Sequence, residues 1–283
     1  MNKAIFHSKN WFDASIEEKL QALQELENEY AQRQGRSPAK IELKEEAEKV
    51  EVNGEVYEKL AGLSKSDNTI VIGRKLLEYT IEDLEHQPDL MMNNVFACHA
   101  ILHEGRHSYQ YYAIHHPEIH ADQKEVQKWK ENERVYYQAP EIYYFFQPLE
   151  RDAENFADHE TKKIFQELEK EFGKDKNFEL YKMKREIEQG ELKLMSMKYF
   201  EKDLESTIQI VEEKISQEYR EAEKRKAEFK KELQEMKEKD PIEVLKGLST
   251  DDRDRKSLNE AVQERRELFE QVISKDRDYG IER

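Results

Sequence analysis

The residues most suited to chemistry lie at 103–107, where the sequence reads His-Glu-Gly-Arg-His. In a helix, positions i and i+4 lie on one face, so the imidazoles of His103 and His107 can bind one metal ion. Neutral imidazole is a preferred ligand of Zn²⁺. A glutamate directly after the first histidine lies beside the metal and can accept a proton from water bound there. The pattern therefore predicts a Zn²⁺ site in which Glu104 is the general base.

The residues around this motif predict the helix that would position it. The segment 90–116 contains no helix breaker except Gly105, and it ends before Pro117. One flank of this segment is apolar enough to be buried, through Phe96, Ala100, Ile101 and Leu102. His99 lies one turn before His103, and we expect it to support the site or to be an alternative ligand.

A third ligand must come from another part of the chain, because Gln110 and Ala113 stand where the same helix would continue the pattern with Gly and His. The segment PLERDAENFAD, residues 148–158, predicts a helix that begins at proline and carries Glu150 and Glu154 on one face. Spacing alone allows either glutamate to be the ligand. A carboxylate in the first turn, as at Glu150, is favoured by the helix dipole.

Two tyrosines precede this second helix closely. Tyr143 and Tyr144 lie a few residues before Pro148. A tyrosine hydroxyl near a metal can stabilise the oxyanion of a tetrahedral intermediate, and we keep both residues as candidates for this role. The alternative is that both rings are packed aromatic side chains without a chemical role.

The motif region resembles zincin metallopeptidases whose third ligand is a glutamate. The helix pattern resembles the third-ligand helix of ImmA/IrrE-like peptidases, through Glu150, Ala153, Phe156 and Ala157. It is also similar to the corresponding helix of CAAX-processing and HtpX-like membrane peptidases. The strand predicted by residues 69–72, Thr-Ile-Val-Ile, resembles the zincin edge strand, which aligns an extended substrate. The resemblance covers about residues 60–165 and implies that Glu150 is the third ligand, Glu154 supports the site, and the substrate is a protein or peptide.

The remaining patterns predict an α+β fold that is mostly helical. Ser15 and Glu18 form a capping box before a helix that ends near Gly35, and Asn53-Gly54 predicts a hairpin. Residues 118–147 are rich in aromatic side chains, and we expect the stretch VYYQAPEIYYFFQP, residues 135–148, to be a packed loop with short elements. We therefore expect a zincin-like domain at 1–165, with a small sheet and an active-site helix, followed by a charged helical extension at 166–283.

The extension carries apolar residues at helical spacing in two segments, 178–238 and 256–275, separated by Pro241. This pattern is typical of an amphipathic bundle packed on itself. The alternative is a coiled-coil surface that binds a protein partner or a second copy of the chain.

Composition excludes several classes of partner. The 283 residues carry a net charge of −16, which would repel a nucleic acid backbone. No segment approaches the roughly 18 apolar residues of a transmembrane helix. The first residues lack the apolar core of a signal peptide, and Cys98 is the only cysteine, so we expect a cytoplasmic protein; signal-independent export would leave no trace in the sequence.

Three functions are compatible with these features. The first is Zn²⁺-dependent hydrolysis of peptide bonds. The second is a zincin-fold scaffold or toxin-associated interaction module with a helical partner-binding tail and little or no turnover, which would not need Glu104. The third is a helical scaffold without a metal. The intact His-Glu-x-x-His pattern favours the first.

Overall fold

A capping box begins the first long helix, Ile16–Arg33, in the computed structural model of the chain. The Ser15 hydroxyl accepts a hydrogen bond from the Glu18 amide, and the Glu18 carboxylate accepts one from the Ser15 amide. The helix ends before Gly35, whose φ of 68° is a left-handed conformation that glycine adopts without strain. Both ends of this helix confirm the sequence prediction.

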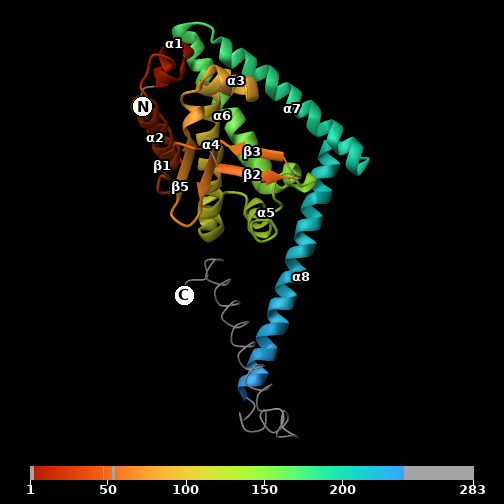
Figure 1. The fold of residues 1–283 in the computed structure, drawn as a ribbon. Coiled ribbons are helices and arrows are strands. Elements are labelled where there is room, and N and C mark those ends of the chain that lie inside the picture. The colour runs from red at the N-terminus through yellow and green to blue at the C-terminus, as the bar shows by residue number, and fades with distance from the viewer. Residues whose placement is uncertain (1–2, 47, 53–54, 239–283) are drawn as a thin grey trace, which may run out of the picture. The chain divides into compact units, whose positions relative to one another are not determined.

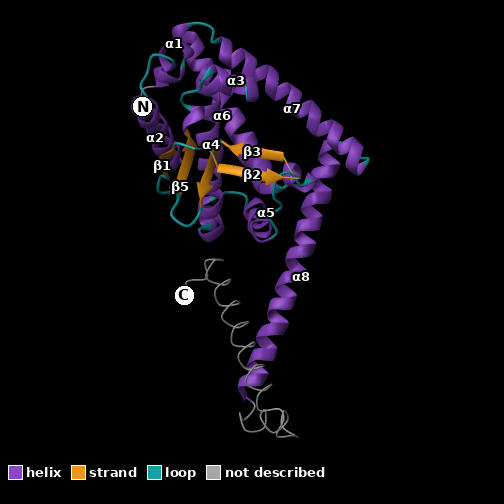
Figure 2. Cartoon of the chain, in the orientation of Figure 1, coloured by secondary structure: helices purple, strands orange, loops and turns teal. Residues whose placement is uncertain are grey.

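The structure describes residues 3–46, 48–52 and 55–238 (Figure 1, Figure 2). Its helices of six residues or more are α2 (Ile16–Arg33), α3 (Ile81–His86), α4 (Asn93–His115), α5 (Gln123–Arg134), α6 (Pro148–Phe172), α7 (Lys176–Phe200) and α8 (Leu204–Glu238). Its short helical turns are η1 (Lys3–Phe6), α1 (Ser8–Trp11), η2 (Arg74–Leu76), η3 (Pro88–Met92), η4 (Pro117–Ile119) and η5 (Ile142–Phe146). Its strands are β1 (Lys40–Lys44), β2 (Glu48–Val52), β3 (Glu55–Lys59), β4 (Ala61–Ser64) and β5 (Thr69–Gly73). The prediction of a mostly helical α+β fold is confirmed.

The larger sheet has three strands in the order β1-β5-β4. β5 pairs with β1 in parallel and with β4 in antiparallel orientation, and its Ile70 and Ile72 are fully buried. The expectation that this strand lies at an edge was wrong, because β5 has a neighbour on each side and β4 is the edge strand beside α4. The hairpin prediction is confirmed by the antiparallel pair β2-β3, although Asn53 and Gly54 themselves lie outside the described residues.

The predicted motif helix is α4, and it occupies the centre of the fold. It packs against α6, α2 and the edge strand β4, and Figure 1 shows it between α2 and α6. Val95 and Ile101 on α4 are fully buried in one core with Leu23 and Leu26 of α2. This burial on several sides fixes the rotation of α4, and therefore the direction of its histidines.

Two helical regions of the structure add detail to the sequence predictions. No helix was predicted between residues 118 and 134, and the structure has the 12-residue helix α5 there, which Asp122 caps by accepting from the amides of Lys124 and Glu125. The loop expected after it is confirmed, with η5 as its short element. The helical character predicted for 178–238 is confirmed, in two helices: α7 ends at Phe200, before Glu201 with a φ of 55°, and α8 begins after Asp203, which accepts a hydrogen bond from the Ser206 amide at 2.8 Å. The helix expected at 256–275 lies outside the described residues.

The chain divides into two compact units, residues 1–220 and 221–283. The first unit extends past residue 165, where the sequence suggested a boundary, and α6 runs through this position without a break. Phe178 and Tyr181 of α7 are buried in the same core as α4. Among the described helices, none is both long and apolar enough to cross a membrane.

Candidate metal centre

Three side chains from two helices converge at the predicted motif. His103 and His107 on α4 present their Nε2 atoms 3.1 Å apart. Glu150, in the first turn of α6, lies with Oε1 3.2 Å from His107 Nε2 and with Oε2 3.5 Å from His103 Nε2. The three ligand atoms are close enough to hold one metal ion. The Glu150 side chain is only 8% exposed, so the group is nearly enclosed.

A glutamine fixes the tautomer of His107. Gln110 donates through its amide nitrogen to the Leu149 carbonyl at 2.9 Å and to Asp152 Oδ2 at 2.6 Å, and both of these are acceptors. Its Oε1 must therefore face His107 Nδ1, which lies 2.8 Å away. Since an oxygen acceptor faces Nδ1, that nitrogen carries a proton, and Nε2 is the atom directed at Glu150 and His103, where the neutral ring can bind a metal.

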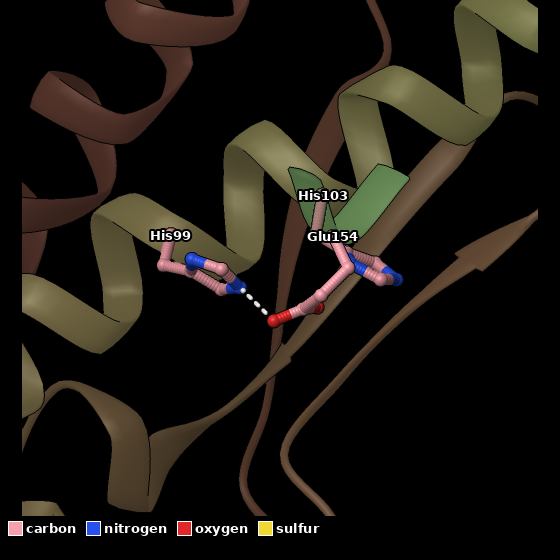
Figure 3. A group of neighbouring side chains, drawn as sticks. All are labelled: His99, His103 and Glu154. Carbon is pink, nitrogen blue, oxygen red and sulfur yellow. Dashed lines mark hydrogen bonds and ion pairs between the residues drawn. The ribbon is translucent and has the colours of Figure 1, made fainter. Parts of the chain in front are cut away.

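A carboxylate orients His103 in the same way. Glu154 Oε2 lies 3.1 Å from His103 Nδ1, so Nδ1 donates and Nε2 is directed at the ligand group. Figure 3 shows His99 and His103 one turn apart on α4, with the Glu154 carboxylate between their rings. His99 Nε2 lies 3.4 Å from Glu154 Oε1. Glu154 therefore supports His103 by a hydrogen bond, which is the role that the sequence suggested for it.

His99, His103 and Glu154 form a second group with metal-ligand spacing. In this group the carboxylate is already neutralised, because Arg185 of α7 forms ion pairs with Glu154 and with Glu188. A guanidinium in contact with the carboxylate opposes a cation at the same place. The His99 Nδ1 atom is also taken: Tyr181 donates its hydroxyl proton to Asp158 at 3.1 Å and so accepts from His99 at 2.9 Å. This group is therefore better suited to orient His103 than to bind an ion.

The charges around the ligand group shift the pKa values of His103 and Glu150 in the direction opposite to burial. Burial would lower the pKa of His103, but the carboxylates of Glu150 and Glu154 outweigh it and raise this pKa well above its ordinary value. Burial would likewise raise the pKa of Glu150, yet hydrogen bonds from His103 and His107 lower it. Glu150 is consequently an anion throughout the physiological range, as a metal ligand requires.

Two tyrosines hold Glu150, the third candidate ligand. Tyr136 donates its hydroxyl proton to Glu150 Oε1 at 2.6 Å, and Tyr144 donates to Oε2 at 2.9 Å. Burial, together with the Glu150 charge, raises the pKa of both phenols, so both remain donors. Of the two predicted tyrosines, only Tyr144 reaches the site. Tyr143 instead packs against Tyr137, with ring centroids 4.9 Å apart, in a separate aromatic cluster.

Glu104 lies between the two histidines in sequence and is half-buried. No side chain in the described part of the chain forms a hydrogen bond or ion pair with its carboxylate. Its charge adds to the causes that raise the pKa of Tyr144, after burial and Glu150, which places it near the site. A cavity of about 350 Å³ opens beside the ligand group and is lined by His103, Tyr144, Glu150, Glu154, Arg185 and Met195, among others.

The close approach of α2 to α4 depends on the glycine inside the motif. Arg36 and Glu27 form an ion pair whose side chains are both 1% exposed. The Arg36 guanidinium donates to the Gly105 carbonyl at 2.9 Å. A Cβ atom at Gly105 would lie 2.5 Å from Glu27 Oε2. Glycine at this position therefore lets a buried ion pair lie against the helix that carries the ligands.

Sequence reasoning placed His103, His107, Glu150, Glu154 and His99 around one centre, and the structure brings them together. It missed four residues that orient them, namely Gln110, Tyr136, Tyr181 and Arg185. Gln110 could have been found, because it lies three residues after His107 on the same helix face. The other three come from α7 or from the segment before η5, and no local pattern marks them.

Comparison with known proteins gives no relative on which to base a function. No family model matches the sequence, and neither the curated proteins nor the solved structures include a significant match to the chain. The function must therefore be argued from the site.

Proposed function

We propose that the protein is a Zn²⁺-dependent peptidase in which His103, His107 and Glu150 hold the ion and Glu104 is the general base. One observation carries this proposal: the Nε2 atoms of His103 and His107 lie 3.1 Å apart, and each lies close to one oxygen of Glu150, His107 at 3.2 Å from Oε1 and His103 at 3.5 Å from Oε2. With zinc–ligand bonds of about 2.0–2.1 Å, neighbouring atoms of a tetrahedral site lie about 3.3–3.4 Å apart. Three protein ligands with both Nε2 atoms directed inward are typical of a catalytic zinc site, which keeps its fourth position open.

The residues around the centre have separate roles in this proposal. A bound Zn²⁺ would polarise the substrate carbonyl and lower the pKa of a water molecule. Glu104, whose carboxylate has no competing partner among the described residues, accepts the proton of that water and later passes it to the leaving amine. Tyr136 and Tyr144 donate to different oxygens of the Glu150 carboxylate. A metal would bind one of these oxygens, and the phenol that donates to the other oxygen would keep the carboxylate oriented. If Oε2 binds the metal, Tyr136 keeps its bond to Oε1, and the Tyr144 hydroxyl, which lines the cavity, can leave Glu150 and donate to a developing oxyanion instead.

The edge strand supports an extended peptide as the substrate. β4 pairs with β5 on one side, and no strand among the described residues pairs with its other side. Its free backbone groups can form hydrogen bonds with a substrate in extended conformation. An apolar cavity of about 430 Å³ lies between this strand, α4 and residues 86–90, and its walls include Leu60, Ala61, Leu76, Phe96 and Ala100.

The position of this cavity indicates the preferred substrate. Ala100 and Phe96 lie three and seven residues before His103, which is about 4.5 to 10.5 Å along the helix axis. An extended peptide advances about 3.3 Å per residue. The cavity would therefore accept an apolar side chain one to three residues from the cleaved bond.

The test combines metal analysis with a search for cleavage products. We expect about one zinc per chain in the purified protein and loss of zinc in His103→Ala and His107→Ala. His159→Ala is the matched control, since that side chain is 75% exposed and lies outside the centre. Zinc retained at full occupancy in a variant that lacks both His103 and His107 would end the proposal.

Turnover is tested by expressing the protein in cells and identifying new protein termini. Glu104→Gln is the control, because an amide cannot accept the proton but keeps the size of the side chain. We expect new termini with the unchanged protein, an apolar residue within three positions of each, and none with Glu104→Gln, although this variant keeps its zinc. Unchanged cleavage by Glu104→Gln would exclude the mechanism, and zinc without any cleavage would favour a binding module.

A further inference from the structure

Helix α7 has two apolar faces that point in opposite directions. On the inner face, Phe178 and Tyr181 are fully buried in the core. The outer face carries five large apolar side chains, which are between 41% and 70% exposed: Leu180, Met183, Ile187, Leu194 and Met197. None of them belongs to a hydrophobic cluster of the described residues. A continuous exposed row of this kind is unusual on a surface that faces only water, and it indicates an interface.

The outer face follows a coiled-coil pattern. Its positions alternate in steps of three and four residues, at 180, 183, 187, 190, 194 and 197. These are the a and d positions of a heptad repeat, which form the contact seam of paired helices. The one small residue in the seam is Gly190, and a Cβ atom added to it would meet nothing within 4 Å. We call these six positions the α7 seam.

We propose that the α7 seam pairs with the α7 seam of a second copy of this chain, in antiparallel orientation. In antiparallel coiled coils an a position packs against a d position of the partner. A single two-fold axis between residues 188 and 189 satisfies this rule along the whole seam. It places Leu180 beside Met197 of the second copy, Met183 beside Leu194, and Ile187 beside Gly190. The seam is thus complementary to itself, as a two-fold interface must be.

The charges beside the seam favour the antiparallel orientation. The positions that flank the seam are the e and g positions of the heptad. In the antiparallel orientation g faces g and e faces e, so Glu186 meets Lys193 of the second copy and Lys184 meets Glu191. Both pairs have opposite charges, and symmetry makes each occur twice. A parallel pair would instead place Glu186 beside Glu191 and Lys193 beside Lys198, which repel.

Three of these four flanking side chains are available for such pairs. Glu186, Glu191 and Lys193 are exposed, and none forms an ion pair with another described residue. Lys184 already contacts Asp89 and Glu188, so the pair of Glu186 with Lys193 is the more important one.

The seam lies apart from the metal centre. Arg185, which binds Glu154, and Ile187 of the seam are two residues apart, so they point to roughly opposite sides of the helix, about 200° apart. Substitutions in the seam should therefore leave zinc binding unchanged, and this proposal can fail or succeed independently of the proposed peptidase activity.

The test is the mass of the full chain in solution, measured by sedimentation equilibrium over a wide range of protein concentrations. We expect a concentration-dependent shift from 34.0 kDa to twice that mass. Replacing Met183 and Leu194 together by lysine should leave only the monomer. These two side chains contact each other across the two-fold axis in two layers of the seam, and the double substitution places lysine opposite lysine in both layers. Ile81→Lys is the matched control, since Ile81 is 81% exposed on α3, outside the seam, and its substitution should leave the mass unchanged.

Charge reversal distinguishes the orientations. Glu186→Lys should raise the dissociation constant about tenfold in the antiparallel pair, and adding Lys193→Glu should restore it. In a parallel pair the same single reversal would create an attraction to Glu191 and strengthen association. The proposal is overturned if the chain is monomeric at every concentration, if the double lysine variant still associates, or if Glu186→Lys strengthens association. A monomer whose Met183 and Met197 resist oxidation would show that another segment of the same chain covers the seam.

Discussion

Gln110 Oε1 accepts a hydrogen bond from His107 Nδ1 at 2.8 Å, and this contact decides which nitrogen of His107 faces Glu150. The glutamine cannot rotate its amide, because its nitrogen already binds the Leu149 carbonyl and Asp152. A local residue on α4 thus orients the His107 ring within the candidate metal centre. Such residues commonly contribute 10- to 100-fold to metal affinity.

We therefore predict that Gln110→Leu weakens zinc binding by about 10- to 100-fold. The leucine keeps the volume but removes the acceptor, so His107 loses its preferred tautomer and orientation. Affinity is measured by competition with a chelator, and thermal unfolding is followed in parallel to separate a loss of fold from a loss of binding. An exposed glutamine on α5, Gln127, serves as the control, and Gln127→Leu should bind zinc as before. Equal affinity of the two variants would contradict this role of Gln110.

The two glutamates of α6 should differ in their effect on zinc. Glu150 contacts both Nε2 atoms, whereas Glu154 contacts His103 only through Nδ1. Glu150→Ala should therefore abolish tight binding, while Glu154→Ala should reduce affinity by about 10- to 100-fold. Tight zinc binding in Glu150→Ala, with loss in Glu154→Ala, would move the ligand to Glu154.

The raised pKa of His103 predicts a pH dependence of zinc affinity. Glu150 and Glu154 hold this pKa well above the ordinary value of about 6.5, so the chelator-treated protein keeps a proton on His103 at neutral pH. Zinc must displace that proton. Affinity should thus fall about tenfold for each pH unit below the raised pKa, with one proton released per ion.

Calorimetry in buffers of different ionisation enthalpy measures this proton release directly. Glu154→Gln removes one of the charges that raise the pKa of His103. In this variant, the release of a proton on zinc binding should therefore be confined to lower pH than in the unchanged protein. Zinc affinity that is constant from about pH 6.5 to 8 would show that His103 is neutral over this range.

The sequence predicted those parts of the site that depend on local spacing. His103, Glu104 and His107 follow from one helical turn, and Glu150 with Glu154 follow from another. How the two helices face each other depends on packing, and this is why spacing left the choice between the two glutamates open. Arg185 and Tyr181 were missed for the same reason, since they lie in a segment whose charge pattern suggested a separate extension. The place of β5 in the sheet was wrong because its neighbour β4 is a short strand without a strong β-branched pattern.

Gly105 should be essential to stability although it lies in the middle of a helix. At an interior position of a helix, alanine normally gives a protein that is more stable than the glycine form by about 0.5–1 kcal/mol. At this position, however, a Cβ atom would lie 2.5 Å from Glu27 Oε2 and 3.3 Å from Arg36 Nη2. Neither group can move freely, because Glu27 also accepts from the Ala39 amide at 2.8 Å and Arg36 binds the Gly105 carbonyl.

We therefore predict that Gly105→Ala lowers the free energy of unfolding by about 1–3 kcal/mol, as overpacking of a buried site does. The control is Gly190→Ala on α7, where the added Cβ meets nothing within 4 Å. At low protein concentration that variant should gain about 0.5–1 kcal/mol from its higher helix propensity. Urea denaturation of both variants measures the difference. Equal stability of Gly105→Ala and the unchanged protein would contradict this packing. It would mean that the pair of Arg36 and Glu27 does not lie against the motif helix, as the 2.9 Å bond from Arg36 to the Gly105 carbonyl places it.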